Sequence, residues 1–594
     1  MKQSHIELKN GTPCLAIGGE LLPACAYMTY FDERNDYAEF AKRGFRVYSV
    51  SVSFASQPIN SSSGFMPYVG GVFDCKGKAD FSAVDEAVDE ILRHCPDAYI
   101  FPRIYVCMPQ WWIDENPQET IRVPLGCQRE AIYSTVFAED ASVMLREMIA
   151  HFRSFHAADH IFGYQISGGN TQEWFHLDLN GSYDPVALPY FNAWLQTHRP
   201  ELYPAATLPP LDELESKDAL TDPYLVAYQR FASESVADTV KTLCRVAKEA
   251  ASHEQIVGVF SGYSAEVSNT MWGTHALEQV IDSPDIDFIS SPNSYMDARA
   301  LGIDWADMLP VDSVKLRGKV CLLECDVRTY LTKSPGESRE GSDPHHYYTH
   351  AVWAGPPTRE LSVAAVRKCL AHQLTHKHGL WWFDMFGHWY DDEALMDEMA
   401  RSLALYTAAT NDAVSEFAAE VAVFLDETSY AMLGRRHPTY PTGFWGRKAL
   451  GLAGAPYDFY LMTDADKIDF TVKGYKAAVF VTLGSPENDA RARAALAKHG
   501  IPLMAVTAEE PQITVEALTA FYRACGVFTY CDTPDVVYVG NGCAALHAAE
   551  AGEKTVRLPR KVWCTDLDTN VCAYTDILRF TCKQYETKLF AMKD

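Results

Sequence analysis

Short apolar runs alternate with amphipathic, Ala/Glu/Lys-rich stretches from the start of the chain to about residue 400. This alternation is typical of consecutive βα units and a parallel sheet. Eight runs predict strands, and they begin at Leu21, Val47, Ala98, Ile161, Ile256, Asp287, Lys319 and Gly379. Eight strands over this length predict a (β/α)8 TIM barrel with long loops. An open doubly wound sheet would use six of them, but no GxGxxG loop follows the first strand.

Amphipathic stretches between these runs predict helices. Residues 36–43 precede a glycine, residues 80–94 carry apolar positions at helical spacing, and residues 358–376 end shortly before Gly379. Glycine just past a helical stretch is a common stop signal. The barrel is therefore expected to occupy residues 1–405.

The pattern changes near residue 405. Four further buried-strand runs and a strong helix over residues 486–499 predict a compact open α/β domain, residues 406–530, without a phosphate-binding loop. From Thr533 the apolar positions follow a period of two, with Gly, Asn and Pro between the runs. This period predicts a small antiparallel β domain over residues 531–594.

Composition and charge narrow the function classes. The net charge of −27 disfavours nucleic acid and anionic membranes as partners, whereas a neutral sugar is unaffected. No secretory signal and no apolar stretch of membrane-spanning length is recognised. The 16 cysteines are scattered without a CxxC pair, which favours reduced thiols and a cytoplasmic location. Aromatic residues make up 12%, which suits a sugar-binding cleft but also a large aromatic core.

Two carboxylates lie where a barrel enzyme would place its catalytic groups. Asn170 and Glu173 follow the fourth predicted strand, and Glu324 ends the seventh. Active sites of such barrels lie at the carboxyl ends of the strands. A glutamate that ends an apolar run is costly to bury without a role or a partner. Two carboxylates so placed suit glycoside hydrolysis, in which one protonates the leaving oxygen and the other attacks the anomeric carbon.

Two motifs carry a family resemblance. CMPQWWIDENPQE, from Cys107, and GCQRE, with Gly126 and Arg129, are similar to elements of the family 42 β-galactosidases in clan A of the glycoside hydrolases. The resemblance covers the whole chain and implies a barrel, a flavodoxin-like trimerisation domain and a small C-terminal β domain. It also implies that Glu173 is the general acid/base, that Glu324 is the nucleophile, and that the protein is a homotrimer.

Two departures from the family pattern leave the sugar open. Asn170 and Glu173 are three residues apart rather than adjacent, and the eighth-strand motif WWFDMFGHWYDD is unusual for family 42. A sister family with the same layout contains β-mannosidases. The expected function is a retaining exo-β-glycosidase, β-galactosidase-like. The alternatives are a β-mannosidase or another exo-β-glycosidase of the same architecture, and a non-catalytic sugar-binding trimer.

Other residues are expected to bind substrate. The resemblance implies that Asn170 binds the 2-hydroxyl, that Tyr295 bonds the nucleophile, and that a strand-eight tryptophan, Trp382, floors the sugar site. Arg129 and Arg328 contact the sugar or nucleophile or form structural ion pairs. Candidates for binding sugar hydroxyls are Asp384 and His388.

No metal and no cofactor is expected. His372, His376 and His378 include a pair at helical spacing, but no carboxylate or cysteine of matching spacing accompanies them, and HExxH is absent. These histidines are interpreted as a solvated helix end with a favourable dipole interaction.

Overall fold

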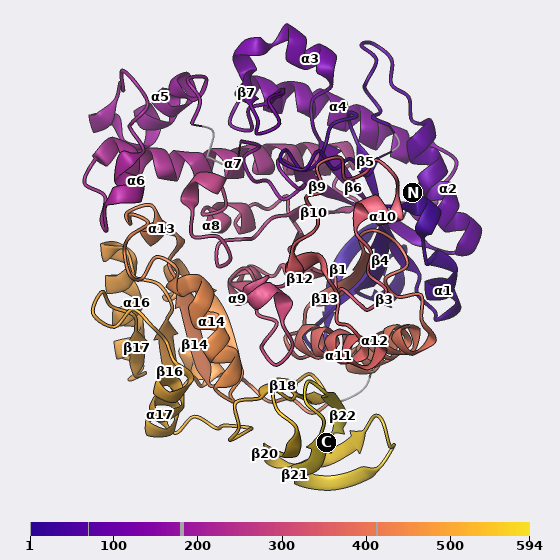
Figure 1. Cartoon of the computed structure of the whole chain (residues 1–594), viewed down its shortest axis with the longest axis vertical. Helices are drawn as coiled ribbons and strands as arrows, with labels where there is room; N and C mark the ends of the chain where they lie inside the picture. Colours follow the sequence, from indigo (N-terminus) through magenta and orange to yellow (C-terminus); the bar gives the residue numbers. More distant parts are fainter. Residues whose placement is uncertain (1, 69, 179–182, 412–413) are drawn as a thin grey trace.

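The computed structural model describes residues 2–68, 70–178, 183–411 and 414–594. Eight parallel strands close into a barrel in sequence order, which confirms the prediction (Figure 1). They are β4 (Cys25–Thr29), β5 (Val47–Ser53), β6 (Tyr99–Val106), β9 (Gly163–Gly168), β10 (Ile256–Phe260), β11 (Phe288–Ser290), β12 (Val320–Cys325) and β13 (Gly379–Asp384). Glu173 and Glu324 thus belong to the carboxyl ends of the fourth and seventh barrel strands.

Helices connect the barrel strands. Ser134 caps the helix at Thr135 by accepting a hydrogen bond from the Phe137 amide, and Asp222 caps the one at Pro223. The helices of this part are α1 (Tyr37–Lys42), α2 (Ser82–His94), α3 (Gln110–Glu115), α4 (Thr135–Ser154), α5 (Ala187–His198), α6 (Asp212–Ser216), α7 (Pro223–Ala250), α8 (Leu277–Ile281), α9 (Val311–Leu316), α10 (Pro335–Ser338), α11 (Arg359–Thr375) and α12 (Glu393–Asn411). A two-stranded ribbon, β7 (Thr120–Arg122) with β8 (Gln128–Glu130), precedes α4.

A three-stranded antiparallel sheet that the sequence analysis did not predict covers one end of the barrel. It consists of β1 (Ser4–Lys9), β2 (Thr12–Ile17) and β3 (Glu20–Pro23). The Ser4 amide bonds the Glu254 carbonyl at 2.9 Å, and the Ser4 hydroxyl bonds the Phe162 carbonyl. Both carbonyls lie just before the amino-terminal ends of barrel strands, β10 and β9, so the sheet closes the amino-terminal end and leaves the carboxyl end for a site.

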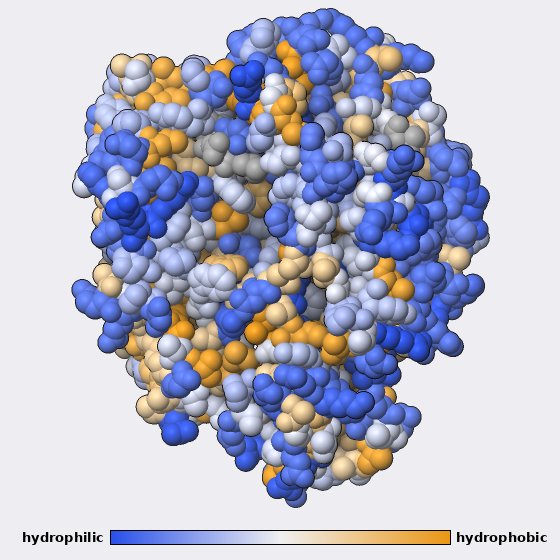
Figure 2. All heavy atoms as spheres, viewed as in Figure 1, coloured by the Kyte–Doolittle hydropathy of each residue, from blue (hydrophilic) through white to orange (hydrophobic). Residues whose placement is uncertain are grey.

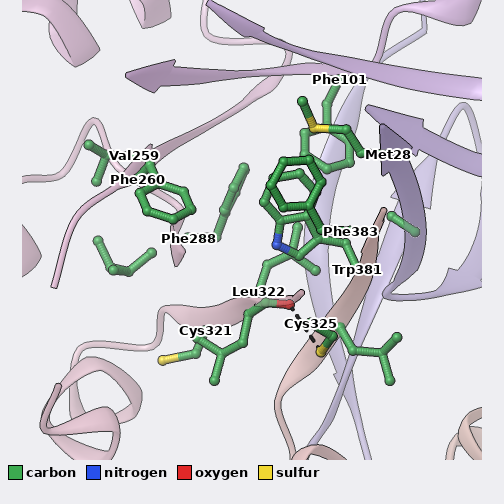
Figure 3. Packing of buried hydrophobic residues seen from close by; sticks show 14 of the residues in the cluster. Met28, Phe101, Val259, Phe260, Phe288, Cys321, Leu322, Cys325, Trp381 and Phe383 are labelled. Carbon is green, nitrogen blue, oxygen red and sulfur yellow. Dashed lines mark hydrogen bonds between the residues drawn. The ribbon is translucent and has the colours of Figure 1, made fainter. Parts of the chain in front are cut away.

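Large aromatic side chains fill the barrel (Figure 3). Trp381 stacks on Phe383 with ring centroids 5.4 Å apart, and Phe101 lies 6.1 Å from Trp381. Gly258 makes room for Phe288, since a Cβ there would come within 2.1 Å of that ring. Burying each such side chain contributes roughly 1.5–3 kcal/mol, which makes the barrel a rigid frame.

The α/β domain contains a four-stranded parallel sheet in the order β15-β14-β16-β17, which matches the flavodoxin-like order. Its strands are β14 (Val421–Leu425), β15 (Tyr457–Leu461), β16 (Ala477–Phe480) and β17 (Leu503–Ala505). Its helices, orange in Figure 1, are α13 (Glu427–Tyr430), α14 (Thr442–Leu452), α15 (Phe470–Lys473), α16 (Pro486–Lys498) and α17 (Val515–Cys525).

The last part of the chain forms the expected antiparallel sheet, in the order β18-β19-β22-β20-β21. Its strands, yellow in Figure 1, are β18 (Val536–Gly540), β19 (Cys543–His547), β20 (Gly552–Asp566), β21 (Cys572–Cys582) and β22 (Thr587–Lys593). The Thr587 hydroxyl bonds the Ala364 carbonyl at 2.7 Å, which ties this domain to α11.

The visible surface is mainly polar. Most of the face shown in Figure 2 is hydrophilic, with smaller hydrophobic groups of atoms between. Among the described residues, no helix has both the length and the apolar character needed to cross a membrane. All sixteen cysteines are free, and most are buried.

Candidate active site

A cavity of about 470 Å³ is lined by both predicted catalytic glutamates, Glu173 and Glu324. Its wall is mostly apolar and aromatic, and the rings come from loops after several barrel strands and from the end of β13. They include Tyr30, Phe65, Phe175, Trp272, Tyr348, Trp353 and Phe383. A concave, mainly apolar cavity with a few polar groups is typical of a small-molecule site.

The loop that carries Glu173 has an unusual backbone. Thr171, Gln172 and Trp174 have positive φ angles of 56°, 68° and 60°, as does Gly169 at 65°. Non-glycine residues rarely adopt this region, and such strain concentrates at functional sites. The Trp174 indole, 1% exposed, fastens the loop by donating to the Ile166 carbonyl at 3.3 Å. The loop is therefore held in one shape, which fixes Glu173 at the cavity wall.

The surroundings of Glu173 suit a proton donor. Burial raises the pKa of Glu173 to about 7, although hydrogen bonds from Thr171 and Tyr263 and the charge of Arg103 oppose the rise. The Thr171 hydroxyl donates to the Glu173 carboxylate at 2.5 Å. A carboxyl group with this pKa is substantially protonated near neutral pH, as a general acid must be.

Glu324 is buried, 2% exposed, and contacts a cation that the sequence analysis missed. The guanidinium of Arg103, in β6, donates from Nη1 to Glu324 Oε2 at 3.3 Å and lies 4.2 Å from the Phe260 ring centroid. Burial raises the pKa of Glu324 well above its usual value, the charges of Arg103 and Arg299 lower it, and those of Asp326 and Glu173 raise it. Arg103 is thus the nearest group that favours the ionised form of Glu324.

Asn170 lines the cavity, as expected. Its amide oxygen accepts hydrogen bonds from the Ser61 amide at 2.7 Å and the Ser61 hydroxyl at 2.9 Å. Because the oxygen is engaged twice, the NH2 group of Asn170 is the part that can serve a ligand, as a donor.

Tyr295 and Arg328 differ from expectation. Tyr295 lines the cavity, but its hydroxyl lies 3.5 Å from Asp326 Oδ2 and makes no recorded bond to Glu324. Arg328 donates to the same Asp326 oxygen at 2.5 Å, so of its two predicted roles it has the structural ion pair. It does not line the cavity. The Tyr295 hydroxyl and the Arg328 guanidinium thus both contact Asp326, two residues after Glu324. Tyr295 therefore faces Asp326 and does not bond the proposed nucleophile.

The structure does not place Trp382, the residue predicted to floor the sugar site, on the cavity wall. Successive strand side chains point to opposite faces, and the Trp382 indole lies outside the barrel, where it donates to Ser402 of α12 at 3.2 Å. Trp381 points inward but packs into the barrel core, below the cavity. Phe383 is the residue of this strand that lines the cavity.

Three more predicted substrate contacts do not line the cavity. Arg129 is 1% exposed and pairs with Glu130 at 3.0 Å, so it forms the structural ion pair of the two alternatives. Asp384 is fully buried and accepts a bond from the Trp389 amide at 3.2 Å. His388 bonds Asp36 at 2.9 Å. Asp384 points away from the cavity because it shares the outward face of β13 with Trp382, whereas the next residue, Met385, lines the cavity again. His388 is held away from the cavity by its bond to Asp36.

The sequence analysis also missed residues on the cavity wall. Tyr263 and Glu266 follow β10, the fifth barrel strand. Glu266 accepts a bond from the Tyr295 amide at 2.8 Å and pairs at 2.9 Å with Arg447 of α14. No local motif marks these residues, and Glu266 lies in the loop past the end of β10, not at a strand end as Glu324 does.

Comparisons with known proteins place the fold. No family model and no curated protein matches the chain. A β-galactosidase from Marinomonas ef1 matches with a TM-score of 0.60 at 12% identity, over 96% of this chain and 100% of that one. A β-galactosidase from Bacillus circulans sp. alkalophilus matches with a TM-score of 0.61 at 12% identity, over 96% of this chain and 98% of that one. A catalytic mutant of a GH42 β-galactosidase from G. stearothermophilus matches with a TM-score of 0.57 at 12% identity, over 96% of this chain and 98% of that one. The chain therefore has the three-domain fold of the GH42 β-galactosidases.

Proposed function

We propose that this protein is a retaining exo-β-glycosidase that hydrolyses terminal, non-reducing β-linked sugars, with β-galactosides as the first candidates. The observation that carries the proposal is the presence of Glu173 and Glu324 in one cavity, at the carboxyl ends of the fourth and seventh strands of a barrel. The shared fold with β-galactosidases supports it.

The proposed reaction is a double displacement. Glu324, ionised beside Arg103, attacks the anomeric carbon, and Glu173 donates its proton to the leaving oxygen. Water then attacks the glycosyl-enzyme, and Glu173 removes its proton. The pKa of about 7 at Glu173 supports both roles, since the group exchanges its proton readily near neutral pH.

The cavity favours a neutral sugar. Its aromatic wall suits the apolar C–H faces of a pyranose, and the net charge of −27 disfavours polyanionic substrates. Nitrophenyl β-galactoside, β-mannoside, β-glucoside and β-fucoside assayed in parallel would identify the sugar. Turnover of the β-mannoside alone would replace the galactosidase proposal by the mannosidase alternative.

Substitution of the two glutamates tests the mechanism. Glu324→Ala should lose nearly all turnover while remaining folded. Glu173→Ala should be slow on poor leaving groups but much less impaired on activated ones, and azide should restore turnover by forming a β-glycosyl azide. Glu266→Gln, a control in the same cavity, should affect good and poor leaving groups equally. If Glu173→Ala is equally slow on both and azide has no effect, Glu173 is not the acid/base.

A non-catalytic sugar-binding protein is the alternative from another class. Calorimetric sugar binding by the wild type, without turnover of any nitrophenyl glycoside, would favour it over the enzyme.

We also propose a homotrimer. The family 42 resemblance implies one, and the α/β domain has no phosphate loop to suggest a ligand role. A closed ring of three uses a heterologous interface. Light scattering at micromolar concentration should give three times the chain mass, and a monomer would refute this assembly.

A further inference from the structure

A buried cluster of ligand-type side chains lies outside the cavity. His372 is in α11, His378 directly precedes β13, and Asp307 lies between β11 and α9. They are 2%, 0% and 6% exposed, and their ligand-type atoms lie within 4.8 Å of one another. This burial contradicts the interpretation of the histidines as a solvated helix end. The carboxylate that their spacing lacked comes from a distant part of the chain.

The separations within the cluster do not correspond to hydrogen bonds. Asp307 Oδ2 lies 3.7 Å from His372 Nε2, and Asp307 Oδ1 lies 3.8 Å from His378 Nδ1. Hydrogen bonds between such atoms span about 2.7–3.2 Å. The carboxylate of Asp307 therefore makes no direct hydrogen bond to either ring, although ligand-type atoms of all three residues lie within 4.8 Å of one another.

Each residue also has a buried polar atom without a hydrogen-bond partner. These atoms are Asp307 Oδ1, His372 Nδ1 and His378 Nε2. Leaving such an atom unsatisfied costs about 1–3 kcal/mol, so a ligand that engages these atoms would stabilise the cluster. A bound cation would satisfy acceptor atoms at such a cluster.

A hydrogen-bond chain orients one of the rings. His378 Nδ1 lies 3.0 Å from the amide oxygen of Gln373, whose nitrogen donates to Asn293 at 2.6 Å. With its amide so oriented, Gln373 accepts a hydrogen bond from the Nδ1–H group of His378, and the lone pair of this ring is on Nε2. Metal-binding histidines characteristically donate their other N–H to an oxygen in this way.

The local charges are compatible with a cation. The nearby Lys315 is positive, but it bonds Asp312 at 3.0 Å and the His376 carbonyl at 2.8 Å. Its charge is therefore countered by a carboxylate other than Asp307.

We propose that Asp307, His372 and His378 bind a structural divalent transition-metal ion of the zinc type, with solvent as the fourth ligand. The ion would fasten the junction of the three domains, because Arg447 of α14 donates to the Asp307 carbonyl and the Tyr538 ring of β18 lies 5.5 Å from that of His372. A cavity of about 310 Å³, lined by His376 and Tyr538, offers an approach. This site is independent of the proposed glycosidase function.

Metal titration of the untagged full-length chain tests the proposal. After EDTA treatment and desalting, the wild type should bind one equivalent of Zn²⁺ at micromolar concentration and melt several degrees higher. Bound Co²⁺ should show the visible absorption of a four-coordinate ion without a thiolate charge-transfer band, which would separate this site from the exposed cysteines. No binding by the wild type up to about 100 µM would overturn the proposal, whatever the variants do.

Matched variants locate the ion. Asp307→Asn, His372→Gln and His378→Gln should each weaken Zn²⁺ binding at least about ten-fold. His376→Gln should bind Zn²⁺ as the wild type does. The His376 ring stacks on that of His372 with centroids 4.3 Å apart, but His376 is not one of the three proposed ligands. Unchanged binding in folded forms of the first three variants would place the ion elsewhere and refute this site.

Discussion

Replacing Arg103 with methionine tests how the charge of Glu324 is maintained. The Arg103 side chain is 1% exposed, contacts Glu324 at 3.3 Å and lies against the Phe260 ring. Methionine keeps an unbranched apolar side chain against that ring but has no charge. Since the proposed nucleophile attacks as an anion, loss of the cation should disfavour the active form of the enzyme.

The separation sets the size of the effect. Two unit charges 3.3 Å apart interact by about 1 kcal/mol at the dielectric constant of water and by about 5 kcal/mol at an effective value near 20. Because about 1.4 kcal/mol corresponds to ten-fold, kcat/KM near neutral pH should fall by roughly ten-fold to a few thousand-fold.

The assay is the pH dependence of kcat/KM on an activated nitrophenyl glycoside. Its acid limb reports ionisation of the nucleophile, and without Arg103 the pKa of Glu324 rises, so this limb should move to higher pH. Arg103→Lys should recover part of the loss. Circular dichroism must verify folding, because removing one partner of a buried ion pair destabilises by about 3–5 kcal/mol. A folded methionine variant with the wild-type acid limb would refute this role for Arg103.

Three further outcomes are expected. Activity should fall as pH rises through about 7, because Glu173 then loses its proton. Thr171→Val removes a hydrogen bond to the charged form of Glu173, so it should raise the pKa of Glu173 and move this fall to higher pH. A pH profile of activity checks both. Trp382→Phe should lower the melting temperature but leave KM within about two-fold, whereas Phe383→Ala should raise KM in steady-state assays. Gly169→Ala should cost about 1–3 kcal/mol or more in urea unfolding, since it combines a positive φ with a Cβ 2.4 Å from a carbonyl oxygen.

The barrel could be predicted because its strands are strongly apolar and separated by clear helices. Placing Glu173 and Glu324 in one cavity followed from the rule that strand ends meet at one face of a barrel. The N-terminal sheet was missed because its strands are short and the first of them, Ser4–Lys9, is only partly buried. The strand Cys543–His547 was missed because it is buried throughout and shows no period of two.

Side-chain direction and distant contacts limited the prediction of the site. Whether Trp382 or Phe383 faces the cavity depends on a register of one residue, which composition does not determine. Arg103 lies within an apolar run, and the argument that a buried charge needs a partner applies to it as to Glu324. Asp307 approaches the two histidines only through the fold, so their spacing gave no sign of it.

The contact between Arg447 and Glu266 has a consequence for how such proteins are recombined. Arg447 is fully buried and belongs to α14, whereas Glu266, 8% exposed, belongs to a wall of the barrel cavity. A barrel detached from its neighbour would leave this carboxylate without a counter-charge, at a cost of several kcal/mol. Exchange of α/β domains between related chains should therefore succeed only where the incoming domain brings an arginine to the same place. The barrel and the α/β domain should therefore be exchanged together rather than separately.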